Sequence, residues 1–76
     1  MQIYEVKAHW DAEASMWWAE SDDVPGLVAE SSTHAGLVEE LRHLVPELLQ
    51  MNRAALAVGR IAFRLVSDQI EDFCYA

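Results

Sequence analysis

The sequence predicts one α+β domain, a two-layer β-β-β-α-β unit in which one main amphipathic helix covers an antiparallel sheet. Three observations support this fold class. Polar and apolar residues alternate over residues 3–10, as in a strand with one buried face. Leucine and valine recur at spacings of three and four over residues 37–49, as in an amphipathic helix. A chain of 76 residues is long enough for a single domain, so we expect residues 1–76 to form one unit.

The first two strands are predicted to form a hairpin. Residues 11–15, with the sequence DAEAS, lack β-branched side chains and suit a loop of about five residues between antiparallel neighbours. The second strand, residues 16–21, carries large apolar groups on both faces, because Trp17 and Trp18 point to opposite sides. One tryptophan must therefore point away from the helix.

A tight turn separates the second strand from the third. Ser21-Asp22-Asp23 leads into Val24-Pro25-Gly26, where proline presets φ and glycine permits the positive φ that follows. The predicted third strand is Leu27 to Glu30. The hydroxyls of residues 31–33 can then accept hydrogen bonds from the first turn of the helix, so Thr33 or Ser32 is the expected N-cap.

The helix and the last strand complete the domain. Pro46 lies inside the helical pattern, where it removes one backbone hydrogen bond, so we expect a kink or a break followed by a second short helix through about Met51. Residues 61–66 alternate again and predict a long final strand. The tail beyond residue 69 could add a short strand or lie loosely against the domain.

Charge limits the classes of partner. The net charge is −8, and the acids are concentrated in residues 1–38, whose net charge is −6. Such a surface repels phosphate backbones, so direct nucleic-acid binding is disfavoured, whereas a basic protein would be attracted. Alternatively, the acids only keep a small apolar-rich domain soluble. No run of about 18 apolar residues is present, and we expect a cytoplasmic protein without a membrane segment.

Catalytic and metal sites are not predicted. His9, His34 and His43 lack the i, i+4 spacing that lets two imidazoles share a metal, and Cys74 has no second cysteine. Neither a Gly-x-Ser-x-Gly elbow nor a phosphate-binding glycine loop occurs. We therefore expect no enzyme, no metal and no cofactor. Because one helix covers only one face of a sheet, we expect a homodimer, a higher oligomer or a partner on the other face, unless one tryptophan folds over an edge of the core.

Two segments carry a resemblance to a known family. They are HWDAEASMWWAESDDVPGLVAESST and LVEELRHLVPELLQMN, with an aromatic strand entering SDDVPGL, a helix start at Thr33 and the motif VPELL. The combined pattern covers roughly residues 3–67 and resembles a small domain-of-unknown-function family related to the HicB-like antitoxins. The resemblance implies a HicB-like, partial RNase-H-like fold of order β-β-β-α-β.

The same resemblance implies a function in a prokaryotic type II toxin-antitoxin system. HicB-like proteins mask a small basic HicA-like toxin that cleaves mRNA, and many carry a C-terminal DNA-binding domain that this chain is too short to contain. The expected partner contacts are two aromatic anchors and three acids that oppose basic toxin groups: Trp17, Trp18, Glu20, Asp22 and Asp23. Core packing of the tryptophans and local turn chemistry of the acids are the competing interpretations.

Two other functions stay open. One is an orphan oligomeric domain that binds a small ligand or a different protein and has no toxin partner. The other is a hydrolase descended from an RNase-H-like ancestor, which would need a divalent ion that these acids do not clearly provide.

Overall fold

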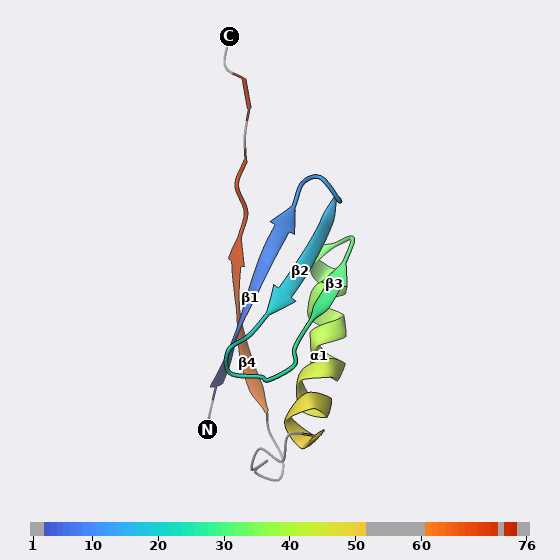
Figure 1. The fold of residues 1–76 in the computed structure, drawn as a ribbon, viewed down its shortest axis with the longest axis vertical. Coiled ribbons are helices and arrows are strands. Elements are labelled where there is room, and N and C mark those ends of the chain that lie inside the picture. Colours follow the sequence, from blue (N-terminus) through green and yellow to red (C-terminus); the bar gives the residue numbers. More distant parts are fainter. Residues whose placement is uncertain (1–2, 52–60, 72, 75–76) are drawn as a thin grey trace.

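The computed structural model describes residues 3–51, 61–71 and 73–74 (Figure 1). The α+β class and the predicted order of elements are confirmed. The elements are β1 (Ile3–Asp11), β2 (Met16–Glu20), β3 (Ala29–Ser31), α1 (His34–Met51) and β4 (Ala62–Asp68). The described part of the chain contains no helix long and apolar enough to cross a membrane.

The four strands form a mixed sheet in the order β3-β2-β1-β4. Strands β1, β2 and β3 pair antiparallel in succession, but β4 pairs with β1 in the parallel direction. The predicted all-antiparallel sheet is therefore wrong. The reason is the path of α1, which returns the chain to the end of the sheet where β3 began, so that β4 runs parallel to β3 and hence to β1 (Figure 1).

The β1–β2 hairpin places the aromatic residues in register. His9 lies opposite Trp18, and Trp10 lies opposite Trp17. In the connecting loop, the Asp11 side chain accepts hydrogen bonds from the backbone N–H groups of residues 13 and 14, at 3.1 and 3.3 Å. This local bonding closes the loop that the sequence predicted.

The Pro-Gly turn has the predicted conformation, but the third strand begins later than predicted. Gly26 has a φ of 82°, and the Leu27 N–H donates to the Val24 carbonyl at 3.2 Å, as in a type II turn. Because the Leu27 amide belongs to the turn, strand pairing starts only at Ala29. Val24 and Leu27 still contribute buried side chains to the core.

Helix α1 starts with the Thr33 cap. The Thr33 hydroxyl accepts the Gly36 N–H at 2.9 Å, and the Thr33 carbonyl accepts the Leu37 N–H at 3.0 Å. The helix continues without interruption through Pro46 to Met51, so the predicted break and second short helix are wrong. Apolar packing explains this continuity, because Val45 and Leu49 on either side of the proline are fully buried.

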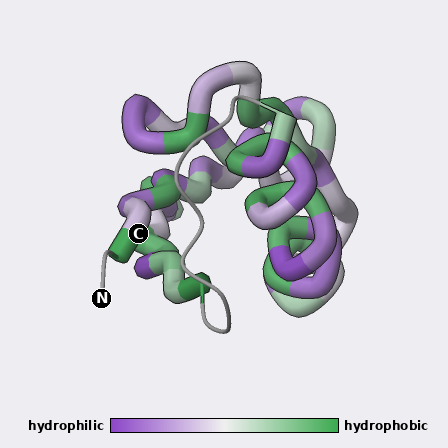
Figure 2. Tube along the Cα trace, turned by 90° about the horizontal axis from the view of Figure 1, so that it is seen from below, coloured by the Kyte–Doolittle hydropathy of each residue, from purple (hydrophilic) through white to green (hydrophobic). Residues whose placement is uncertain are grey.

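The core lies between α1 and one face of the sheet. The helix packs against β2 and β3, and seen end-on it stands beside the strands with hydrophilic and hydrophobic residues mixed around its turns (Figure 2). The buried side chains come from both layers: Tyr4, Val6, Ala8, Ala19, Val24, Leu27, Ala29, Leu37, Leu41, Val45 and Leu49. The opposite face of the sheet is not covered by a helix of the described chain.

The tail continues beyond β4. Its described residues, 69–71 and 73–74, are not in a strand and extend away from the body of the domain (Figure 1). Ile70 and Phe73 are exposed there. The sequence left two arrangements open for the tail, a further short strand or loose packing against the domain. The described residues of the tail form no strand.

Candidate functional site

The sheet face that points away from α1, called here the open face, is not covered by another element of the described chain. Alternation along each strand assigns its residues. Tyr4, Val6 and Ala8 are buried on the helix side, so their neighbours along β1 point outward. With the strand registers, the open face carries Glu5, Lys7, His9 and Asp11 from β1, Met16, Trp18 and Glu20 from β2, and Arg64, Val66 and Asp68 from β4.

The centre of the open face is an aromatic and acidic cluster around His9. The imidazole stacks on the Trp18 indole with ring centroids 4.4 Å apart and an interplanar angle of 29°. Its Nε2 atom lies 2.8 Å from Glu20 Oε2, and its Nδ1 atom lies 3.9 Å from Asp68 Oδ2. The His9 side chain is only 25% exposed.

The contact between His9 and Glu20 is electrostatic rather than a well-directed hydrogen bond. Although the two atoms are close, Nε2 is buried and makes no hydrogen bond to any described residue. A protonated imidazole would form an ion pair with Glu20, and the same ring also stacks on Trp18.

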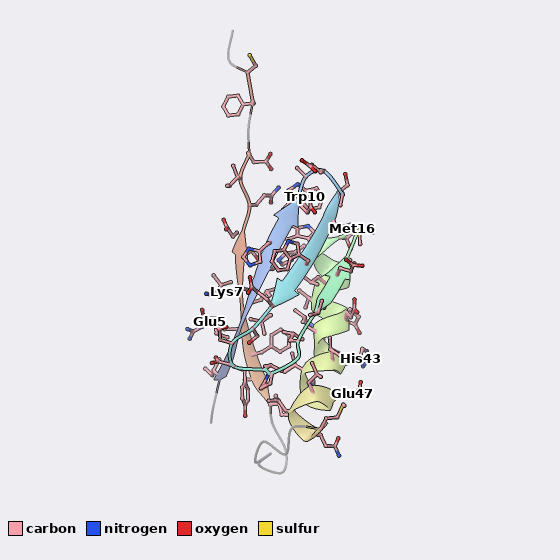
Figure 3. The ribbon with its side chains drawn as sticks, in the orientation of Figure 1. Glu5, Lys7, Trp10, Met16, His43 and Glu47 are labelled. Carbon is pink, nitrogen blue, oxygen red and sulfur yellow. The ribbon has the colours of Figure 1, made fainter. Side chains whose placement is uncertain are left out.

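An open groove of about 500 Å³ runs from this cluster to the hairpin loop and the start of the tail. Its walls are aromatic, acidic and apolar, and they consist of His9, Trp10, Asp11, Ala12, Glu13, Trp18, Asp68 and Ile70. Three carboxylates around an indole suit a cationic side chain, because the ring face and the carboxylates both attract positive charge. Figure 3 shows Trp10 and Met16 near the hairpin end of β1 and β2, with Glu5 and Lys7 toward the start of β1.

The two predicted tryptophan contacts lie on opposite faces of the sheet. Trp18 is 39% exposed on the open face. Trp17 lies on the helix side, partly buried against the core, with its ring 4.9 Å from His34 edge to face and 5.5 Å from Trp10. The His34 Nε2 atom in turn shares a hydrogen bond of 2.9 Å with the Ser67 hydroxyl of β4. Trp17 and Trp18 therefore do not belong to one surface.

Asp22 and Asp23 lie apart from the His9 groove, at the other end of β2. The Asp23 carboxylate accepts the Glu5 backbone N–H at 2.8 Å, and the Ser21 hydroxyl donates to the Glu5 carbonyl. The loop thus satisfies backbone groups of β1 where pairing with β2 has ended. Glu5, Lys7, Asp22 and Asp23 line a small hollow of about 190 Å³ there. The structure brings Trp18 and Glu20 together, and it separates both from Asp22 and Asp23.

His9 and Asp68 were missed as site residues in the sequence. The length of the hairpin loop could have predicted that His9 lies opposite Trp18. Asp68 reaches the cluster only through the parallel pairing of β1 with β4, and no pattern of neighbouring residues in the sequence predicts that pairing. Among the described residues, no group of three or more histidine, cysteine, aspartate or glutamate side chains is arranged to hold a metal ion.

Comparison with known proteins gives a family and a fold relative. The family model described as "Domain of unknown function (DUF1902)" matches residues 3–76. A crystal structure of a hypothetical protein from the extremely thermophilic bacterium Thermus thermophilus is similar, with a TM-score of 0.81 and 43% sequence identity. The match covers 95% of this chain and 100% of that chain. No curated protein matches.

Proposed function

The chain belongs to the family described as a domain of unknown function (DUF1902), and we propose that it is an antitoxin-like protein-binding module. In this proposal the protein acts in the cytoplasm of a prokaryote, in a type II toxin-antitoxin system. It masks a small basic HicA-like toxin that cleaves mRNA. The proposal assigns the chain no catalytic role and no cofactor.

The observation that carries the proposal is the groove beside Trp18. It combines an exposed indole with the carboxylates of Asp11, Glu13 and Asp68 on an open sheet face. An arginine or lysine of a partner would meet a π face and acids at the same point, and a cation over an aromatic ring is worth about 0.5–2 kcal/mol. Its open shape favours a side chain presented by another protein over an enclosed small molecule.

The net charge and the resemblance to HicB-like antitoxins support the same class of partner. The net charge of −8 would steer a basic protein toward this chain and speed the encounter. The HicB-like part of the proposal rests on the motif string from Trp10 to Leu49 and on the β-β-β-α-β order of the elements. We propose Trp18 as a contact in the groove, Glu20 as a contact next to His9, and Asp22 and Asp23 as a separate acidic contact. Trp17 would act indirectly, by packing beneath the hairpin.

One observation favours a second candidate, a small-ligand-binding or protein-interaction domain without a toxin partner. The groove volume of about 500 Å³ lies within the range of about 300–1,000 Å³ that small-molecule sites occupy. A cationic small molecule would use the same indole and carboxylates. The two candidates differ in whether a basic protein encoded beside this chain binds it.

The test is a calorimetric titration of this protein with the small basic protein encoded next to it, with RNA cleavage measured on the same mixtures. We expect tight binding that weakens with added salt and silences cleavage. Trp18→Ala and Glu13→Lys should each raise the dissociation constant about tenfold or more, since an anchor or an attractive charge is lost.

Glu47→Lys is the matched control. Glu47 is exposed on α1, away from the open face, so this substitution changes the charge by the same amount at a different surface (Figure 3). Equal losses for Glu13→Lys and Glu47→Lys would show that only net charge matters and that the groove is not the contact. Absence of binding by the wild-type chain would overturn the antitoxin proposal and favour the small-ligand candidate.

A further inference from the structure

Strand β4 is an edge strand whose outer side is unpaired in the described chain. It pairs with β1 over seven residues on one side, and no described strand lies on the other. An edge of this length presents backbone N–H and C=O groups that can pair with another strand. The opposite edge strand, β3, has only three residues and offers a much shorter template.

The exposed side chains of β4 make this edge complementary to itself. Arg64, Val66 and Asp68 follow one another on the open face. Asp68 is 71% exposed in its side chain, and Val66 is 43% exposed. Arg64 is exposed and forms no ion pair with any described residue. A cation and an anion thus lie at equal distances on either side of an exposed valine.

We propose that β4 pairs antiparallel with β4 of a second copy of this chain, with Val66 on the two-fold axis. The axis stands perpendicular to the sheet, because only that symmetry keeps the open faces of both copies on the same side. Arg64 then lies opposite the partner's Asp68, and Asp68 lies opposite the partner's Arg64. Directly opposed charges of opposite sign stabilise an antiparallel pair.

The neighbouring registers lack this complementarity. Centring the pair on Arg64 would set two guanidinium groups against each other. Centring it on Leu65 or Ser67 would place Arg64 or Asp68 opposite an apolar residue. A two-fold pair keeps residues of one face opposite residues of the same face, so intermediate registers do not arise. The Val66 register is the one in which both charges of each copy are matched.

The same register covers exposed apolar side chains. Extended past the end of β4 at Asp68, this pairing would set Ile70 of one copy opposite Ala62 of the other, and Ala62 is the β1 neighbour of Ile3. Ile70 is 82% exposed and Ile3 is 50% exposed in the single chain. Pairing therefore brings two exposed isoleucines toward each other and joins two four-stranded sheets into one. The proposed contact shares Asp68 and Ile70 with the groove around Trp18, but it does not depend on the toxin proposal.

Charge exchange tests the register. Sedimentation equilibrium on the full chain should show a dimer, and Arg64→Asp or Asp68→Arg alone should raise its dissociation constant roughly tenfold or more, because each creates two like-charged pairs. The double exchange, Arg64→Asp with Asp68→Arg, should restore most of the association. Arg42→Asp, a matched change on exposed α1, should leave the dimer unchanged. Failure of the double exchange to recover association would overturn the register.

Cross-linking tests the axis independently of charge. In a Cys74→Ser background, Val66→Cys should oxidise to a covalent dimer, because residues on the axis of an antiparallel pair have Cα atoms about 4.5–5.5 Å apart, within disulfide range. Val28→Cys is the control, since Val28 is 79% exposed but lies outside β4. A monomer at all concentrations, or equal cross-linking of both cysteines, would overturn the proposal.

Discussion

At Gly36 the first turn of α1 passes close to two hydroxyl groups. A Cβ atom placed on Gly36 would overlap the Ser31 hydroxyl and would lie 2.9 Å from the Thr33 hydroxyl. The sequence alone predicts that this glycine weakens the helix start, because glycine costs about 0.5–1 kcal/mol relative to alanine in a helix. The structure instead shows that the space for a side chain is occupied by the cap.

Gly36→Ala should therefore destabilise the fold despite its better helix propensity. The new methyl group would displace the Thr33 hydroxyl from the Gly36 N–H, and loss of an N-cap costs about 1 kcal/mol. Crowding adds to this cost, so we expect a net loss of about 1 kcal/mol in the free energy of unfolding. Urea denaturation followed by circular dichroism measures it.

Ser31→Ala supplies the control for this prediction, because it removes the closer hydroxyl. The cost of Gly36→Ala should be smaller in the Ser31→Ala background than in the wild-type chain, which a double-mutant cycle reports directly. A stabilising effect of Gly36→Ala in the wild-type chain would mean that propensity outweighs the close contacts.

At the scale of elements, α1 is the clearest case of packing that overrides local preference. Pro46 lacks the N–H that would bond one turn back, yet the helix extends five residues beyond it. Leu37, Leu41, Val45 and Leu49 are spaced so that all are buried on one stripe. Breaking the helix would expose the last two, and burial of one such side chain is worth about 1.5–3 kcal/mol.

Pro46→Ala should stabilise the protein by about 1–3 kcal/mol. Alanine restores the backbone donor and is about 3 kcal/mol more favourable than proline inside a helix. Part of this gain is lost, because the Pro46 ring is partly buried and its packing contacts disappear in the variant. Thermal unfolding, with helix content measured on the same samples, checks this expectation. Glu47→Ala, at the neighbouring exposed position, should change stability by less than about 0.5 kcal/mol. A Pro46→Ala protein no more stable than the Glu47→Ala protein would show that the proline ring packs as well as it disrupts.

At the scale of the whole molecule, excess acidity affects both the fold and its partners. A net charge of −8 on 76 residues produces self-repulsion in the folded chain. Helix α1 gains no compensating dipole interaction, because its first turn holds no acid and its last turn holds no base. The same charge attracts a basic protein, so added salt should act on the two processes in opposite directions.

Raising sodium chloride from about 10 mM to about 150 mM should raise the thermal unfolding midpoint of the isolated protein, because the screening length falls from about 30 Å to about 8 Å. The variant Glu40→Lys with Glu47→Lys changes two exposed helix acids and should show a smaller rise. Over the same range of salt, binding of a basic partner should weaken. An unfolding midpoint that falls with salt in the wild-type protein would show that attractive ion pairs, such as Arg42 with Glu39, outweigh the repulsion.

The sequence by itself determined the local structure of this protein. Alternation, helical spacing, the Pro-Gly turn and the Thr33 cap each depend on residues close together in the chain, and all four are present in the structure. It also indicated that one of two adjacent tryptophans would face away from the helix, and Trp18 does. Only the tertiary structure decided the parallel pairing of β4, the continuity of α1 through Pro46 and the meeting of His9 with Asp68. These features depend on contacts between residues far apart in sequence. Their energies exist only once the sheet and the helix are assembled, so the sequence around each residue does not predict them.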